Sequence, residues 1–103
     1  MRTALVTDTG RHVIVTGPIV CDTGERAAVR VTVTQRTTGA VAEGITRVVC
    51  RGTEQQWKVH AAAYGNESFE QGTAWAVGLA RTSDGARTTD AHQWLVEIAL
   101  AAD

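Results

Sequence analysis

Alternation of apolar and polar side chains is the feature that most limits how this chain can fold. It is clearest in Ala27–Arg36, where apolar residues, mostly valine, at every second position alternate with arginine and threonine. Successive side chains of a β-strand point to opposite faces, so the pattern predicts a strand with one buried and one solvated face. β-Branched side chains also pack well on such a pleated surface.

The same period of two recurs along most of the chain, and turn residues separate the segments. The further strands are expected at Thr3–Thr7, His12–Cys21, Val41–Cys50, Gln56–Tyr64, Thr73–Arg81 and His92–Leu100. Glycine-containing turns fall between several of them, as at Asp22–Gly24 and Ser83–Gly85. About seven short strands at this spacing predict an all-β fold, and we expect an antiparallel β-sandwich.

Three tryptophans lie on the apolar parity of their strands. Trp57, Trp75 and Trp94 are therefore predicted to anchor the core, because each aromatic side chain buries a large area. The alternative is a stacking platform for a sugar or another planar ligand. The pair Gly17-Pro18 interrupts the second strand, and proline cannot donate to a ladder, so an edge strand or a bulge is expected there.

Length and composition indicate one soluble domain spanning residues 1–103. The chain has 103 residues, of which 44% are hydrophobic and 20% charged, as in globular proteins. The net charge of −1 offers no electrostatic attraction to nucleic acid or to an anionic membrane. No apolar run approaches the ~20 residues that span a bilayer, so no membrane insertion is expected. The N-terminus has no long apolar region, so a leader is expected to be absent from the sequence as written.

Two cysteines, Cys21 and Cys50, leave three alternatives open. They form a disulfide between strands, they are two buried free thiols, or one of them is catalytic. No CxxC spacing indicates a redox pair or half of a zinc site. The disulfide is the favoured interpretation.

Residue patterns for catalysis are not found. His12, His60 and His92 are far apart in sequence, without the short spacings of metal ligands. Ser68 and Ser83 both lie in predicted loops, and neither has a GxSxG context. We therefore expect a protein that is not an enzyme and that uses no cofactor and no metal.

Two polar loops carry the candidate contact residues. In Gly65–Gly72 a phenylalanine stands among acidic residues, and it either caps the core or anchors a partner. The turn in Arg81–Arg87 is polar and is expected to be exposed. The residues predicted to bind a partner are Phe69, Glu67, Glu70, Asp84 and Arg87.

The ensemble of Cys21, Val29–Arg36, Gly44–Cys50 and Gln56–Val59 resembles a group of small secreted actinobacterial domains. These are similar to immunoglobulin-like sandwiches and are mostly of unknown function. The resemblance covers roughly residues 15–100, and it implies an immunoglobulin-like antiparallel β-sandwich of about seven strands with one disulfide. It also implies export to an oxidising compartment. Some relatives carry a second cysteine pair late in the chain, which this sequence lacks.

The expected function is that of a non-enzymatic, secreted interaction module that binds another protein, as a subunit or adaptor in a larger extracellular assembly. Two alternatives remain open. One is a small-ligand carrier of the antibiotic-binding immunoglobulin-like type, with a tryptophan-lined pocket between loops. The other is a secreted enzyme inhibitor that presents a rigid loop to an active site.

Overall fold

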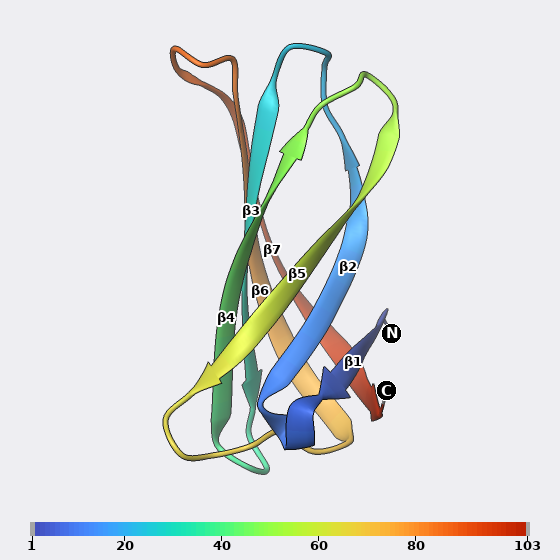
Figure 1. Cartoon of the computed structure of the whole chain (residues 1–103), viewed down its shortest axis with the longest axis vertical. Coiled ribbons are helices and arrows are strands. Elements are labelled where there is room, and N and C mark those ends of the chain that lie inside the picture. The colour runs from blue at the N-terminus through green and yellow to red at the C-terminus, as the bar shows by residue number, and fades with distance from the viewer. Residues whose placement is uncertain (1, 103) are drawn as a thin grey trace.

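Seven β-strands lie within the described part of the chain, as the alternation predicts. A computed structural model describes residues 2–102, and Figure 1 shows the elements in chain order. The elements are β1 (Arg2–Thr7), the 3-10 turn η1 (Asp8–Gly10), β2 (His12–Val20), β3 (Arg26–Gln35), β4 (Ala40–Val49), β5 (Glu54–Tyr64), β6 (Gly72–Ser83) and β7 (Thr88–Ala102). The molecule is elongated, with extents of 40 × 22 × 21 Å.

The strands close into a barrel instead of forming two separate layers. Their order around the barrel is β1-β2-β5-β4-β3-β6-β7, and only the closing pair, β1 with β7, is parallel. The β3–β4 hairpin pairs along its full length, from Arg26 with Val49 to Gln35 with Ala40, so the sheet is continuous from β3 to β4. The predicted all-β class and strand number are confirmed. The expected sandwich is corrected to a barrel, because β1 pairs with both β2 and β7, and β3 pairs with both β4 and β6.

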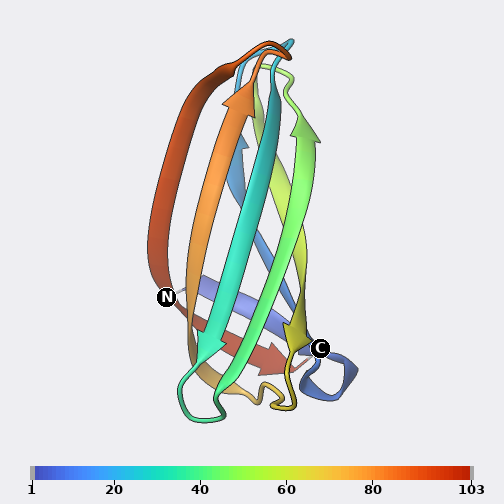
Figure 2. The same cartoon turned by 90° about the vertical axis from the view of Figure 1, so that its left-hand side faces the viewer.

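Two connections cross from one side of the barrel to the other and define its two ends. The β2–β3 connection passes over the top of Figure 1, beside the β4–β5 and β6–β7 loops, and Cys21 and Cys50 are bonded there. We call this the disulfide end. The β5–β6 connection passes under the opposite end, beside η1 and the β3–β4 turn, as Figure 2 also shows. We call this the Phe69 end.

The barrel interior is filled mainly by valine and alanine. In β3 the burial alternates as the sequence predicts, with Val29, Val31 and Val33 at most 1% exposed. In β5 the burial alternates in the same way, and Trp57, Val59 and Ala61 are buried. The other buried members are Ala4, Val13, Val15, Ala40, Ala42, Phe69, Ala74, Ala76, Ile98 and Leu100. The side chains of one parity thus fill a narrow barrel.

Strand β6 reverses the predicted parity. Trp75 and Val77 face outward, with exposed fractions of 37% and 47%, while Ala74 and Ala76 are buried. The prediction that Trp75 belongs to the core is therefore wrong. The small inward residues leave room for bulky side chains from the neighbouring strands, such as Trp94 of β7, which lies against Gly78.

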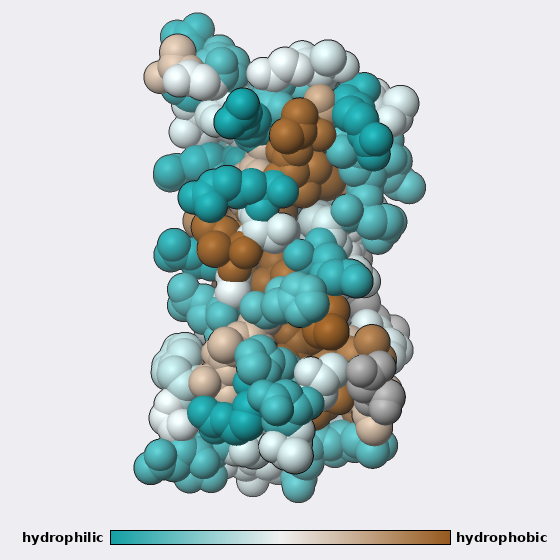
Figure 3. Space-filling model, viewed as in Figure 1, coloured by the Kyte–Doolittle hydropathy of each residue, from teal (hydrophilic) through white to brown (hydrophobic). Residues whose placement is uncertain are grey.

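On the face of Figure 1, polar side chains lie between the apolar ones, and no continuous apolar surface forms there (Figure 3). Scattered apolar residues of this kind are normal on soluble proteins.

Candidate functional site

A mismatch in strand length opens the barrel on one side. β1 has 6 residues whereas β7 has 15, so β1 separates β2 from β7 over only part of their length. It pairs with β2 at His12–Ile14 and with β7 at Ile98–Ala102. Beyond those residues, toward the disulfide end, no strand within residues 2–102 pairs with either facing edge.

A cavity of about 530 Å³ occupies this opening. We call it the slot. Its walls come from β2, β5, β6 and β7, and most of the side chains that line it are apolar. The lining residues are Pro18, Ile19, Val20, Trp57, Ala80, Thr82, Asp90, Ala91, His92, Trp94, Leu95 and Val96. Its size falls within the ~300–1,000 Å³ common for ligand-binding clefts.

Two tryptophans form the centre of the slot. The ring centroids of Trp57 and Trp94 are 5.8 Å apart, and the planes are tilted by 43°. The indole N–H of Trp57 donates a hydrogen bond of 3.2 Å to the carbonyl of Pro18 across the strand pair. Trp57 is 4% exposed, as predicted for a core residue, whereas Trp94 is half-buried. Trp94 thus presents part of its ring to the slot.

A glycine makes the position of Trp94 attainable. Gly78 is the cross-strand partner of Trp94, and a Cβ at Gly78 would overlap the six-membered ring of the indole. The ring therefore lies directly against the β6 backbone, an arrangement in which an aromatic side chain covers a strand glycine. Any side chain at position 78 would displace the ring.

The inward row of β7 becomes steadily more exposed toward the disulfide end. Ile98 is fully buried, Val96 and Trp94 are half-buried, and His92 is exposed. The imidazole of His92 stacks on Trp94, with centroids 6.2 Å apart and planes 21° apart. The slot therefore continues the barrel core outward into solvent.

The disulfide supports the wall of the slot that β2 provides. Cys21 and Cys50 are bonded at 2.03 Å with a Cα–Cα distance of 5.3 Å, which confirms the favoured alternative. With Ala27 they form a small buried cluster, and Ile19 packs against this cluster as well as lining the slot. The cysteine cluster is separate from the main core, and Cys21 directly follows the end of β2.

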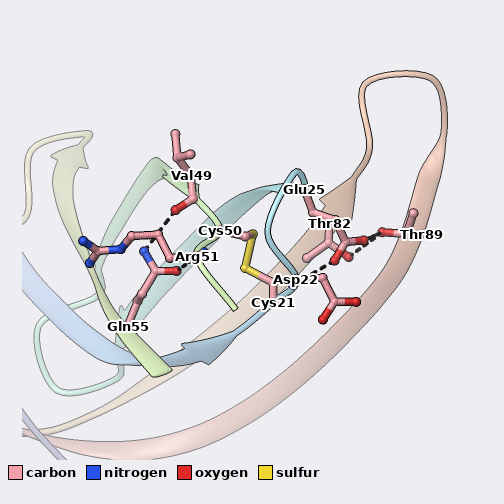
Figure 4. The surroundings of a disulfide bond; sticks show 9 residues. All are labelled: Cys21, Asp22, Glu25, Val49, Cys50, Arg51, Gln55, Thr82 and Thr89. Atoms are coloured by element: carbon pink, nitrogen blue, oxygen red, sulfur yellow. Dashed lines mark hydrogen bonds between the residues drawn. A yellow bond between two sulfur atoms is a disulfide. The ribbon is translucent and has the colours of Figure 1, made fainter. Parts of the chain in front are cut away.

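Polar contacts tie the loops of the disulfide end together (Figure 4). Glu25 accepts a hydrogen bond from the Thr89 hydroxyl, which also lies 3.0 Å from the Thr82 hydroxyl. Gln55 bridges the β4 end and the following loop, donating to the Val49 carbonyl and accepting from the Arg51 N–H. Because Glu25 lies in the β2–β3 loop and Thr89 in β7, their contact ties this loop to the start of β7.

Three of the predicted partner-binding residues lie at the Phe69 end, far from the slot. Phe69 is 4% exposed and packs in the core, so it follows the capping alternative. Glu67 and Glu70 are exposed beside it. Arg11 holds this loop to the end of β5 by donating hydrogen bonds to the carbonyls of Ala63, Gly65 and Glu67, at 2.6–3.1 Å. The buried amide of Gln35 bonds both the N–H and the carbonyl of Glu70.

The other two, Asp84 and Arg87, are exposed on the β6–β7 hairpin at the disulfide end. One oxygen of Asp84 accepts hydrogen bonds from the N–H groups of Ala86 and Arg87 at 2.9 and 3.1 Å. These bonds favour the carboxylate and hold the pKa of Asp84 below its ordinary value. Neither residue lines the slot, so the structure does not bring the five predicted residues together.

The slot residues themselves were missed by sequence reasoning, except for the two tryptophans. Pro18, Ile19 and His92 carry no motif. The available signal was the placement of Gly78 on a strand of alternating bulky residues, since a glycine inside a strand often marks a close approach.

Within residues 2–102, no group of three or more histidine, cysteine, aspartate or glutamate side chains is arranged to hold a metal ion. In the same range, no helix is long and apolar enough to cross a membrane. No protein-family model, curated protein or solved structure matches the chain. Function is therefore inferred from the geometry of the slot.

Proposed function

We propose that this chain is a non-enzymatic, secreted, immunoglobulin-like domain that binds a partner protein through the slot. The single observation that carries the proposal is the solvent-open cavity lined by Trp57 and Trp94. Aromatic residues in pockets dominate the energetics of protein interfaces. An apolar hollow that is continuous with the core gains more from being filled by a guest than from holding water.

The strand order supports the immunoglobulin-like assignment. Immunoglobulin constant domains place strands A, B, E and D in one sheet and C, F and G in the other. In the same lettering, β1-β2-β5-β4 and β3-β6-β7 follow one another around this barrel. The β3–β4 hairpin and the β1–β7 pair join what would otherwise be two sheets. The link between the ends of the second and fourth strands departs from the inter-sheet disulfide of antibody domains, which joins strands B and F.

The apolar rim of the slot supports a protein as the partner. Val20 and Leu95 line the opening and are 68% and 65% exposed, so each offers most of its surface to a docking chain. A disulfide that closes a loop with a sequence separation of 29 is typical of exported proteins, which supports a partner outside the cytoplasm.

Site-specific photocross-linking tests this proposal. A benzophenone side chain placed at Leu95 should form a covalent adduct with another protein when the domain is secreted by its native host. The matched control places the same group at Thr32, which is on the outer face of β3. Adducts from position 32 with none from position 95 would refute binding through the slot.

A small-ligand carrier is the second candidate, and the cavity volume of about 530 Å³ favours it. Substituting Trp75→Phe removes the outward tryptophan and leaves Trp57 and Trp94 as the only two tryptophans of the chain. A library of apolar aromatic compounds should then quench or shift the remaining emission. An unresponsive spectrum throughout the library would exclude this candidate.

A further inference from the structure

The occupant of the slot is indicated by the strand that fills the same gap lower down. β1 lies between β2 and β7, pairs with both, and places Ala4, which is 3% exposed, in the core. Val6 packs against the same core from the same face of the strand. The slot is the continuation of this gap toward the disulfide end, beyond the pairing of Arg2 with Ile98.

One of the two edges facing the slot is blocked. Pro18 has no N–H to donate, and strand prolines are found where the donor would face away from the partner strand. Since Pro18 pairs with Gln56 on the β5 side, its blocked position faces the slot. Its carbonyl is already hydrogen-bonded to the Trp57 indole. The β2 edge is therefore a poor template for another strand.

The β7 edge is an open template. Between Asp90 and Glu97 it contains no proline, lysine or glycine, and β6 pairs only with its other edge. Within this stretch the Ala91 N–H donates to the Asp90 carboxylate. Natural proteins usually protect a long strand edge of this kind with such residues, because its free N–H and carbonyl groups recruit other strands. The Glu25–Thr89 contact limits the open stretch at one end and β1 limits it at the other.

The side chains beside this edge set the chemistry of a guest strand. Ile19, Trp57, Trp94 and Val96 present an apolar interior. A strand lying there would direct alternate residues inward, as β1 does with Ala4 and Val6. At ~3.3 Å per residue, the open edge matches a guest of roughly six to eight residues.

We infer that the slot binds an extended segment of the partner protein, which pairs with β7 in parallel, in line with β1, and packs apolar side chains at alternate positions onto the Trp57–Trp94 pair. This inference rests on the proposed function and specifies its mode, which is strand addition. The guest completes the barrel over the stretch that β1 leaves open.

Synthetic peptides test whether the slot binds its guest by strand addition. The probes are nine-residue peptides with lysine at each end and an alternating core of threonine with valine, leucine or phenylalanine. At least one should slow hydrogen exchange of the β7 amides between residues 90 and 97 by tenfold or more. Amides of β4 serve as the internal control, because β4 lies on the other side of the barrel.

Backbone N-methylation supplies the matched control peptides. Alternate residues of a strand direct their N–H groups to opposite neighbours, so methylation of one alternate set should abolish binding and methylation of the other should be tolerated. Equal binding of both methylated forms, or failure of all three probes, would overturn strand addition.

The remaining outcomes separate the two proposals. Quenching of Trp94 by 8-anilinonaphthalene-1-sulfonate without peptide binding would leave the slot as a binding site and refute only the strand mode. Cross-links from position 95 together with unprotected β7 amides would have the same meaning. Protection of these amides that rises with protein concentration alone, with a dimer in sedimentation, would mean that a second copy occupies the edge and would also refute the inference.

Discussion

The indole of Trp94 lies against the bare backbone of Gly78, its cross-strand neighbour. This contact joins the core to the slot, because the same ring also faces Trp57 and supports the imidazole of His92. The geometry of the slot therefore depends on the absence of a side chain at one position of β6.

Substituting Gly78→Ala should push the Trp94 ring out of its place and into the slot. Overpacking of this kind costs about 1–3 kcal/mol of unfolding free energy. Denaturant unfolding and the emission of the Trp75→Phe background variant would measure both effects. Val77→Ala, on the exposed neighbouring residue, is the control and should change stability by well under 1 kcal/mol. An unaltered emission and unfolding midpoint in the Gly78 variant would contradict the contact.

Removing the disulfide should destabilise the domain strongly. In the chain-entropy model, closure of a loop with a separation of 29 residues contributes about 3–4 kcal/mol. The double substitution Cys21→Ser and Cys50→Ser, or a reductant, should thus lower the melting temperature markedly. Because Ile19 packs on the cysteine cluster, binding of 8-anilinonaphthalene-1-sulfonate to the slot should also change. Identical melting with and without reductant would show that the bond adds no stability.

Shortening Phe69 should weaken the closed end of the barrel. Phe69→Ala removes a buried aromatic ring and is expected to cost about 3–5 kcal/mol. Glu70→Ala is a suitable control. The Glu70 side chain is exposed, and the hydrogen bonds of Glu70 with Gln35 are made by its backbone N–H and carbonyl, which the substitution retains. Thermal unfolding should separate the two variants clearly. If Phe69→Ala were as stable as Glu70→Ala, the core position of the ring would be refuted.

The β6–β7 hairpin should loosen at acidic pH. The N–H groups of Ala86 and Arg87 lower the folded-state pKa of Asp84, so the carboxylate stabilises the hairpin. That contribution is present above the unfolded pKa of about 3.9 and is lost as the pH falls through the lower folded value. An NMR titration of the carboxyl carbon and of both amides would follow it. Asp84→Asn keeps an oxygen acceptor and should remove the pH dependence; persistence of the transition in that variant would assign it to another group.

Local alternation was sufficient to predict the strands and most of the core. In β3 and β5 one parity is polar, so only the other can face inward, and these assignments were right. In β6 both parities are apolar or small, and the sequence contains no local rule for choosing between them. The choice is made by Trp94 of the adjacent strand, which requires glycine opposite it. A prediction based on side-chain size alone therefore placed Trp75 in the core, whereas it faces outward.

Closure of the barrel and the slot could not be predicted because both depend on pairing between the two ends of the chain. The paired residues of β1 and β7, such as Arg2 and Ile98, are 96 positions apart, and their parallel register has no local signal. The slot arises from the difference in their lengths, together with the position of Pro18. The predicted contact residues were chosen for being polar loop residues, whereas the structure places the apolar opening along strand edges.

The parallel pairing of β1 with β7 also has a mechanical consequence. Arg2 is at the start of this ladder and Ala102 at its end, so a pull on the two ends of the chain acts along the strands and in opposite directions. Such a load shears all the hydrogen bonds of the pair at once, whereas a load across the strands would open them one after another. Tension between the chain ends is thus opposed first by the ladder that seals the barrel, and it reaches the slot and the disulfide end only after that ladder fails.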